Sequence, residues 1–220
     1  MKEVYKIKNN PFKIVRMFEE EVMNYTGAPH AIAVDSCTDA LFLCCLYKKV
    51  EAVTIPSQTY LSVPMSIIQA GGKVVFDEYR NDWKGGYELS PYNIFDCAKR
   101  FTSGMYDVAG SLMCLSFHSK KILPIGKGGM ILTDNWEAMQ WFKRMRYEGR
   151  GERMYQRDDI TMMGYNMYMT PFQATRGLEL LSNLPLHNDD QEEQNGYKDL
   201  TEYTVFSDCN IIHKQEGILV

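Results

Sequence analysis

The feature that most constrains this fold is a regular alternation of short apolar runs with stretches of helical periodicity. The apolar runs are rich in Val and Ile and predict strands at residues 31–34, 52–56, 73–76, 92–96, 111–117 and 129–134. Continuous apolar runs are typical of strands that are covered on both faces. The stretches between and after them predict helices at residues 12–25, 38–47, 62–70, 136–147 and 171–184. The sequence therefore predicts an α/β fold with a mostly parallel central sheet and helices on both faces.

Length and charge narrow the class of protein. The chain has 220 residues, which is room for one domain with a short addition. Its 24 basic and 28 acidic side chains give a formal net charge of −4, which does not favour binding to nucleic acid. No apolar run approaches the roughly 18 residues that span a bilayer, and no apolar stretch follows the N-terminal charges as it would in a secretory signal.

The six cysteines are irregularly spaced and include no Cys-x-x-Cys pair. Zinc sites usually contain such pairs, so the sequence predicts no metal site. Unpatterned cysteines in apolar stretches are typical of a reducing compartment. We therefore expect a cytoplasmic protein without a metal, nucleic-acid or membrane partner.

Small polar residues open the helix predicted after the first strand. Ser36, Cys37 and Thr38 stand at this junction. The N-terminus of a helix presents free N–H groups and a partial positive charge, which suit a phosphate. Taken alone, Ser or Thr at such a place is more often an ordinary helix cap.

An aspartate ends the predicted strand at residues 92–96. In open α/β sheets, ligands bind beyond the carboxyl ends of the strands. Asp96 could therefore pair with a protonated ring nitrogen of a bound cofactor. The alternative is a cap or turn residue without a ligand.

Two lysines follow the next buried strand. Residues 116–121 read Ser-Phe-His-Ser-Lys-Lys, and a glycine-rich turn follows at 126–129. A lysine at this place is a candidate nucleophile that forms a Schiff base with a carbonyl group. The alternative is a pair of surface lysines before a turn, and His118 alone is more typical of a hydrogen-bonding residue than of an acid–base catalyst.

The order of these elements is more specific than any one of them. A phosphate-binding helix start, an aromatic residue, a strand-end aspartate and then a lysine describe the site of a fold type I pyridoxal phosphate enzyme. In such a site Asp96 keeps the pyridine nitrogen protonated, and the lysine binds the cofactor covalently.

The chain resembles the DegT/DnrJ/EryC1/StrS family of sugar aminotransferases from about Phe18 to Pro185. The most specific segment is SFHSKKILPIGKGGMILT, residues 116–133. The other matching segments are AIAVDSCTDAL (31–41), PSQTY (56–60), GGKVVFD (71–77), DCAK (96–99) and GYN (164–166). In this register the resemblance identifies Lys121, not Lys120, as the Schiff-base lysine.

The resemblance implies a role for each matching residue. Lys121 and Asp96 would be catalytic, and Tyr60 would stack on the cofactor ring. The remaining cofactor-binding residues would be Ser36, Cys37, Thr38, Lys99, Ser116, His118 and Asn166. Of these, Asn166 would reach the phosphate in the neighbouring subunit of a homodimer.

The resemblance also implies a reaction. Family members use pyridoxal 5′-phosphate to transfer an amino group, usually from glutamate, to a keto group on a nucleotide-linked sugar. This chain departs from the family pattern at Cys37 (usually glycine), Lys99 (usually Gln or His), Ser111 (usually an acid) and Tyr168 (usually arginine).

The chain is also shorter than family members. We expect residues 1–185 to form the cofactor-binding large domain and residues 186–220 to form a short segment in place of the small domain. Stretch 186–202 is polar and acidic and is typical of a solvated connection, whereas the last residues could add one or two strands.

Two alternatives to an aminotransferase remain. A non-catalytic relative that keeps the fold would fit the departures and the short length. A related sugar dehydratase is less well supported, because in that enzyme histidine replaces the Schiff-base lysine.

Overall fold

The computed structural model describes residues 12–152, 155–192 and 196–214. Its strands are β1 (His30–Val34), β2 (Ala52–Pro56), β3 (Lys73–Asp77), β4 (Tyr87–Leu89), β5 (Ile94–Asp96), β6 (Leu112–Ser116), β7 (Gly129–Thr133) and β8 (Asn210–Ile212). Its α-helices are α2 (Phe12–Thr26), α3 (Cys37–Lys48), α4 (Ser62–Gln69), α5 (Trp136–Met145) and α6 (Pro171–Leu181). Short 3₁₀ helices lie at Glu78–Arg80, Tyr155–Arg157, Leu200–Glu202 and Thr204–Phe206.

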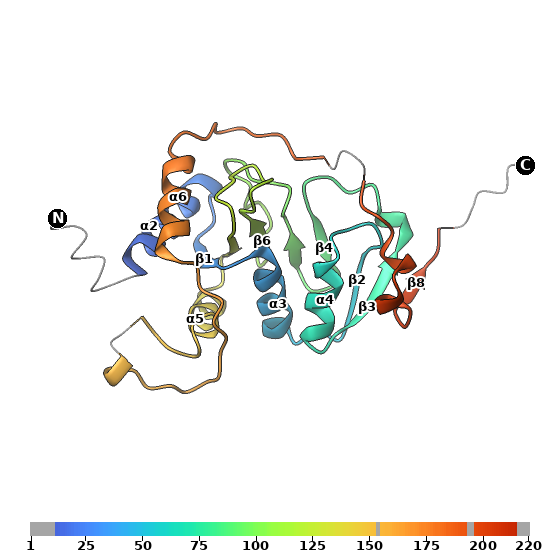
Figure 1. Cartoon of the computed structure of the whole chain (residues 1–220), viewed down its shortest axis with the longest axis horizontal. Helices are drawn as coiled ribbons and strands as arrows, with labels where there is room; N and C mark the ends of the chain where they lie inside the picture. Colours follow the sequence, from blue (N-terminus) through green and yellow to red (C-terminus); the bar gives the residue numbers. More distant parts are fainter. Residues whose placement is uncertain (1–11, 153–154, 193–195, 215–220) are drawn as a thin grey trace, which may run out of the picture.

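The strands form two ladders, in the order β1-β7-β6-β5-β4 and β2-β3-β8. Thr54 and Ser90 exchange backbone hydrogen bonds of 2.9 and 3.1 Å, which link β2 to the end of β4. Figure 1 shows the strands following one another across the molecule. The predicted α/β fold class is therefore confirmed.

The sheet is mixed, where the sequence predicted a mostly parallel one. The pairs β2–β3, β3–β8 and β5–β6 are parallel, whereas β1–β7, β6–β7 and β4–β5 are antiparallel. Parallel neighbours need a crossover connection, usually a helix. A tight turn joins β4 to β5, so these neighbours run in opposite directions, whereas the longer connection at residues 97–111 lets β5 and β6 run parallel without a helix between them.

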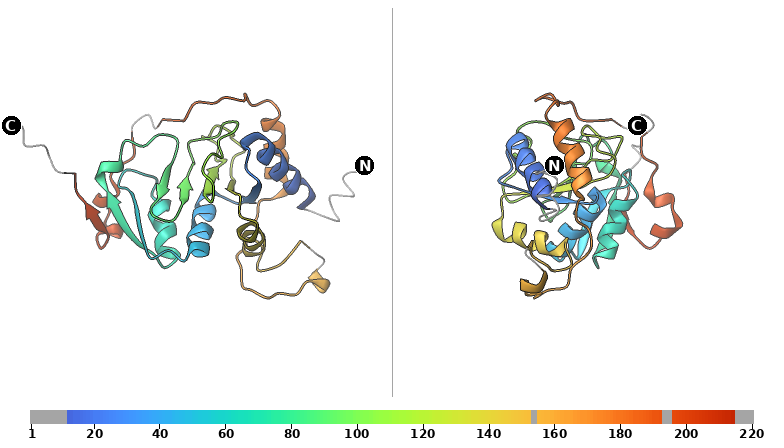
Figure 2. Two further views of the ribbon diagram at one scale, coloured as in Figure 1. Left: turned by 180° about the vertical axis from the view of Figure 1, so that it is seen from behind. Right: turned by 60° about the vertical axis from the view of Figure 1, so that its left-hand side comes forward.

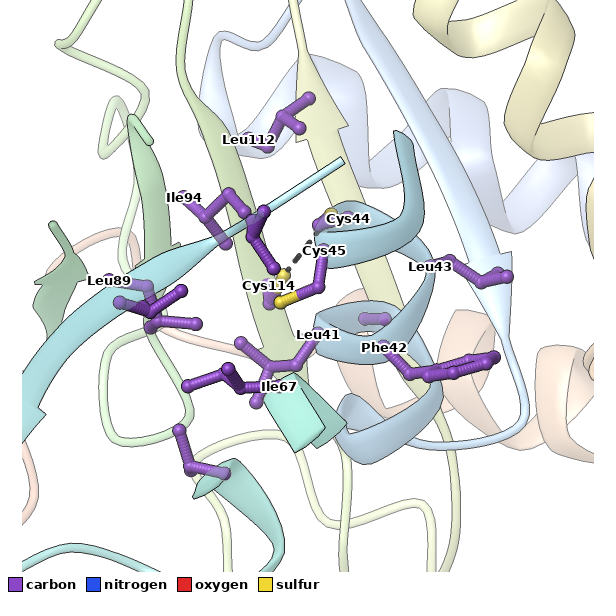
Figure 3. Packing of buried hydrophobic residues seen from close by; sticks show 14 of the residues in the cluster. Leu41, Phe42, Leu43, Cys44, Cys45, Ile67, Leu89, Ile94, Leu112 and Cys114 are labelled. Carbon is purple, nitrogen blue, oxygen red and sulfur yellow. Dashed lines mark hydrogen bonds between the residues drawn. The ribbon is translucent and has the colours of Figure 1, made fainter. Parts of the chain in front are cut away.

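Both faces of the sheet are covered, as the continuous apolar runs predicted. Ile32 and Val34 of β1 lie in one core cluster, with residues of α3, α4 and α5. Ala31 and Ala33 point to the opposite cluster, with residues of α2 and α6. Figure 3 shows the first cluster, where Leu41 and Cys44 of α3 face Cys114 of β6. Figure 2 shows the helices on either side of the sheet.

The sequence did not predict β4, whereas β8 lies in the last part of the chain, where the sequence allowed one or two strands. β4 has only three residues, Tyr87–Leu89, which is too short for an apolar period to stand out. β8, in the last part of the chain, pairs in parallel with β3 and extends the sheet at its edge. β5 begins at Ile94 rather than at residue 92, because the turn before it places Asn93 in the left-handed region with φ of 57°.

Three findings concern membrane spans, metal sites and the cysteines. Among the described residues, no helix is long and apolar enough to cross a membrane. The described part of the chain contains no group of three His, Cys, Asp or Glu side chains placed to hold a metal ion. All six cysteines are free thiols, and Cys44 and Cys114 lie with their sulfur atoms 3.6 Å apart in the core.

A buried ion pair joins α2 to the end of α5. Arg146 is fully buried, and its guanidinium bonds to the carboxylate of Glu19 and to the backbone carbonyl of Ala33 in β1. Glu19 also accepts a hydrogen bond of 2.9 Å from the Ala33 N–H. The pair therefore fixes a helix from each face of the sheet to the same edge strand.

Removing one partner of this ion pair should destabilise the folded protein. We expect Arg146→Met to lower the free energy of unfolding by about 3–5 kcal/mol, because it leaves the Glu19 carboxylate buried without its cation. The double variant Glu19→Leu, Arg146→Met should recover most of that loss. Urea unfolding of the three proteins tests this, and a double variant as unstable as Arg146→Met would contradict it.

Candidate active site

A cavity of about 1050 Å³ opens where β1, β5 and β6 end and α3 begins. This is the edge of an α/β sheet at which ligands usually bind. Nine of the ten predicted site residues line it: Ser36, Cys37, Thr38, Tyr60, Asp96, Lys99, Ser116, His118 and Lys121. The fold thus brings together residues that lie up to 85 positions apart (121 − 36) in the sequence.

The N-terminus of α3 forms one wall of the cavity. Ser36 caps the helix by accepting a hydrogen bond of 3.0 Å from the Asp39 N–H, and Thr38 bonds to the Ser62 hydroxyl at 2.8 Å. Both interpretations of this segment therefore apply, since a capped helix still presents its other first-turn N–H groups. Those groups and the helix dipole favour an anion at this wall.

The glycine-rich turn has a steric purpose at Gly129, the first residue of β7. A Cβ at Gly129 would lie 2.4 Å from the Ser36 carbonyl carbon and 2.5 Å from the Cys37 nitrogen. Those are backbone atoms, which cannot move aside without displacing the start of α3. Glycine at this position therefore lets β7 pack directly under the helix N-terminus.

Asp96 lies at the floor of the cavity, where only 5% of its surface is exposed. Its carboxylate accepts hydrogen bonds from the Ala98 N–H at 2.9 Å and from the Tyr87 hydroxyl at 3.2 Å. Burial raises the pKa of Asp96, and the Ala98 N–H and the Lys121 charge partly oppose that rise. The Cys37 thiol lies 4.0 Å from the same carboxylate.

Lys121 lies on the loop that follows β6 and lines the same cavity as Asp96. Its charge lowers the pKa of Asp96, so the two groups interact across the site. His118 shapes this loop. Its carbonyl accepts the Lys121 N–H at 2.9 Å, and its ring nitrogen Nδ1 accepts the Lys120 N–H at 3.3 Å.

Lys99 is buried in the cavity wall beside two aromatic rings. Its ammonium lies 5.2 Å from the centre of the Trp83 ring and 4.6 Å from that of the Tyr197 ring. Such cation–π contacts stabilise a charge that has lost water. The Lys99 charge also lowers the pKa of Asp96.

Three predicted residues are exposed, Tyr60, His118 and Asn166. Tyr60 lines the cavity with 54% of its surface exposed, so its ring is open to a ligand. Asn166 lies outside the cavity lining, and its amide donates a hydrogen bond of 2.8 Å to Glu148. Its contact with a neighbouring subunit stays a prediction.

The sequence did not identify three lining residues, Gln191, Glu192 and Tyr197. They belong to the polar segment after α6, where neither apolar periodicity nor a motif marks them. Only the path of the chain in space brings them to the cavity.

The family model of the DegT/DnrJ/EryC1/StrS aminotransferases matches residues 7–84 and 92–209. The chain belongs to this family. The match includes the α3 N-terminus, Asp96 and the Lys121 loop, and it extends into the segment after α6.

Two curated relatives have similar sequence identity to this chain. The spore coat polysaccharide biosynthesis protein SpsC of Bacillus subtilis is 26% identical over 77% of this chain and 57% of its own length. A UDP-4-amino-4,6-dideoxy-N-acetyl-beta-L-altrosamine transaminase of Campylobacter jejuni is 24% identical over 85% of this chain and 61% of its own length. The chain thus spans about three fifths of the relatives it matches.

A solved structure shows the same fold. The Helicobacter pylori aminotransferase PseC, involved in pseudaminic acid biosynthesis, superposes with a TM-score of 0.63 at 18% identity. The superposition covers 84% of this chain and 62% of PseC. The fold is that of the large domain of fold type I pyridoxal phosphate aminotransferases.

The cavity residues fit pyridoxal phosphate. The α3 N-terminus offers N–H groups to a phosphate, and the buried carboxylate of Asp96 suits a protonated pyridine nitrogen. The Lys121 amine can bond to an aldehyde carbon, and the open Tyr60 ring can cover a flat heterocycle. This set of groups matches each polar end of the cofactor.

The buried Asp96 carboxylate should lower the free energy of unfolding of the cofactor-free protein at neutral pH. Its pKa is raised in the folded state, so stability is lost as pH rises from ~4, the ordinary carboxyl pKa, through the raised value. We expect Asp96→Asn to raise the free energy of unfolding at neutral pH by roughly 0.5–2 kcal/mol. The gain should shrink towards pH 4.

Urea unfolding of both cofactor-free proteins over this pH range measures the effect. Asp208→Asn, at an exposed position, is the matched control and should change nothing. A gain that is the same at every pH would contradict the assignment to the Asp96 charge.

Proposed function

We propose that this protein is a pyridoxal phosphate-dependent aminotransferase that moves an amino group to a keto group on a nucleotide-linked sugar. The observation that carries the proposal is the meeting of Asp96 and Lys121 in one cavity beside the α3 N-terminus. SpsC and PseC are named for polysaccharide and pseudaminic acid biosynthesis, and the Campylobacter relative is a transaminase of a UDP-linked amino sugar, which supports the substrate class. As the sequence predicts, we place the reaction in the cytoplasm.

In this proposal the cavity residues bind three parts of the cofactor: the phosphate, the pyridine nitrogen and the face of the ring. Ser36, Cys37, Thr38 and Ser116 hold the phosphate through the α3 N-terminus and the end of β6. Asp96 holds the pyridine nitrogen, and Tyr60 covers the ring. When bound, pyridoxal phosphate supplies an electron sink and a carbonyl carbon that carries the amino group between substrates.

The proton transfers belong to Lys121. Its Nζ would hold the cofactor covalently and would be released when the donor amino acid binds. The released Nζ then takes the proton from the donor Cα, and in the second half-reaction it delivers a proton to the sugar carbon that gains nitrogen. His118 holds the backbone of the Lys121 loop during both steps.

The charge of the cavity suits anionic substrates. The cavity lining contains four lysines and two acids, of which Asp96 is buried: Lys99, Lys120, Lys121, Lys127, Asp96 and Glu192. A nucleoside diphosphate and the carboxylates of an amino donor such as glutamate both carry negative charge. Coulomb attraction is strongest in such a sheltered site.

Covalent attachment tests this function directly. Borohydride reduction of protein incubated with pyridoxal phosphate should attach the cofactor to Lys121, as read by peptide mass spectrometry. Lys121→Ala should abolish the attachment, whereas Lys120→Ala should keep it. Labelling that is spread over both lysines, or that survives in Lys121→Ala, would contradict the proposal.

The second candidate is a non-catalytic relative that binds the cofactor without turnover. The Cys37 thiol beside Asp96 and the cationic Lys99 favour it, because both alter the surroundings of the pyridine ring. Glutamate added to the loaded protein separates the two candidates. Conversion of the bound cofactor to its amino form supports the enzyme, and tight binding without conversion supports the second candidate.

We further propose that two copies form a homodimer through the segment around Asn166. Three large apolar side chains near Asn166 in the sequence are exposed: Met163 at 92%, Tyr165 at 41% and Phe172 at 90%. Large exposed apolar side chains are typical of a protein interface. Such a dimer would bring Asn166 towards the phosphate of the other subunit.

Sedimentation at micromolar concentration tests the dimer. The unaltered protein should sediment as a dimer, and Phe172→Asp should shift it to a monomer by placing a charge in the interface. Trp136→Gln, at another exposed aromatic position, should leave the dimer intact. A monomer before any substitution would contradict the proposal.

A further inference from the structure

The segment after α6 crosses the side of the molecule that contains the cavity. Figures 1 and 2 show it leaving α6, running along the sheet and ending at β8 on the opposite side of the molecule. Its described residues from Asn188 to Leu200 contact loops on several strands. The sequence predicted a solvated connection here, but specific contacts hold this segment in place.

An ion pair anchors the segment beside the cavity. The Arg100 guanidinium donates two hydrogen bonds to the Asp190 carboxylate, at 2.9 and 2.6 Å. Gly85 leaves room for this carboxylate, since a Cβ there would lie 2.1–2.4 Å from its atoms. Two parallel hydrogen bonds between charged groups fix orientation as well as distance.

The next residue, Gln191, joins two loops of the site. Its backbone N–H donates a hydrogen bond of 2.9 Å to the Lys99 carbonyl. Its side-chain amide donates one of 3.1 Å to the Lys120 carbonyl. Lys99 lies three residues after Asp96, and Lys120 directly precedes Lys121.

The two hydrogen bonds of Gln191 lie just beyond the point where the β5–β6 ladder ends. β5 and β6 pair in parallel up to Asp96 and Cys114, and the Cys97 N–H adds one more bond to the Cys114 carbonyl. Beyond that point, no backbone hydrogen bond between the two loops is among those found in the described residues. Gln191 therefore replaces the missing ladder with one bond to each loop.

The far end of the segment is fixed as well. Tyr197 stacks on Trp83 with ring centres 5.9 Å apart. The Ser57 hydroxyl donates a hydrogen bond of 2.7 Å to Asp199, and the Leu200 N–H donates one of 2.9 Å to the Ser57 carbonyl. With anchors on both sides, Gln191 has little freedom to leave the cavity rim.

We propose that Gln191, held by the Arg100–Asp190 pair, is a positioning residue that sets the placement of the Lys121 loop relative to Asp96. The proposal rests on the proposed function, in which those two groups act on one cofactor. It assigns to the segment after α6 the ordering of the site.

Gln191→Leu tests the proposal, because it removes the amide but keeps the size and the backbone bond. In the cofactor-free protein, amide hydrogen exchange of peptides covering residues 118–122 should rise about two- to tenfold, the effect of losing one hydrogen bond. The Kd for pyridoxal phosphate should rise by a similar factor. Asp189→Asn, whose side chain is 98% exposed, is the matched control and should change neither value.

Arg100→Gln provides the second variant, because it releases the anchor without touching Gln191. It should raise exchange in residues 96–101, 118–122 and 188–192 together. Unchanged exchange in residues 118–122 in both variants would overturn the proposal. Absence of pyridoxal phosphate binding in the unaltered protein would overturn the proposed function, while the exchange measurements would still decide whether Gln191 orders the two loops.

Discussion

The parallel pairing of β5 with β6 is the constraint on which the site depends. It sets Asp96 opposite Cys114, so that the aspartate and the loop after Ser116 emerge at the same edge of the sheet. Because the backbone of both strands is buried, a shift of one residue would turn every side chain to the opposite face. The register is therefore held by the core, through Ile94, Leu112 and Cys114 on the α3 side.

Around this edge the fold retains charged groups in buried positions. Asp96 and Lys99 are each about 95% buried, and each has partners that offset the loss of water. Sites that bind charged cofactors commonly reduce the stability of the free protein in this way. The Glu19–Arg146 pair differs, because its two charges bond to each other and to the Ala33 backbone, and neither residue lines the cavity.

The polar segment after α6 covers part of the cavity rim and packs on the rest of the protein. A chain that spans three fifths of its relatives would be expected to leave the cavity rim uncovered. Instead, Gln191, Glu192 and Tyr197 line the cavity, and β8 extends the sheet next to β3. The proposed division at residue 185 remains a prediction, but the part after it packs on the part before it through the Arg100–Asp190 and Ser57–Asp199 contacts.

The sequence by itself determined the α/β class, the covered sheet and nine residues of the cavity. It did so because apolar runs and strand-end polar residues are local signals, and the order of Ser36, Asp96 and Lys121 is typical of one family. The direction of β4 and β7, the surroundings of Lys99 and the hydrogen bonds of Gln191 were decided only in the tertiary structure. Hairpin connections, cation–π contacts and hydrogen bonds between distant loops depend on which segments meet in space, and no local pattern in residues 186–202 encodes that meeting.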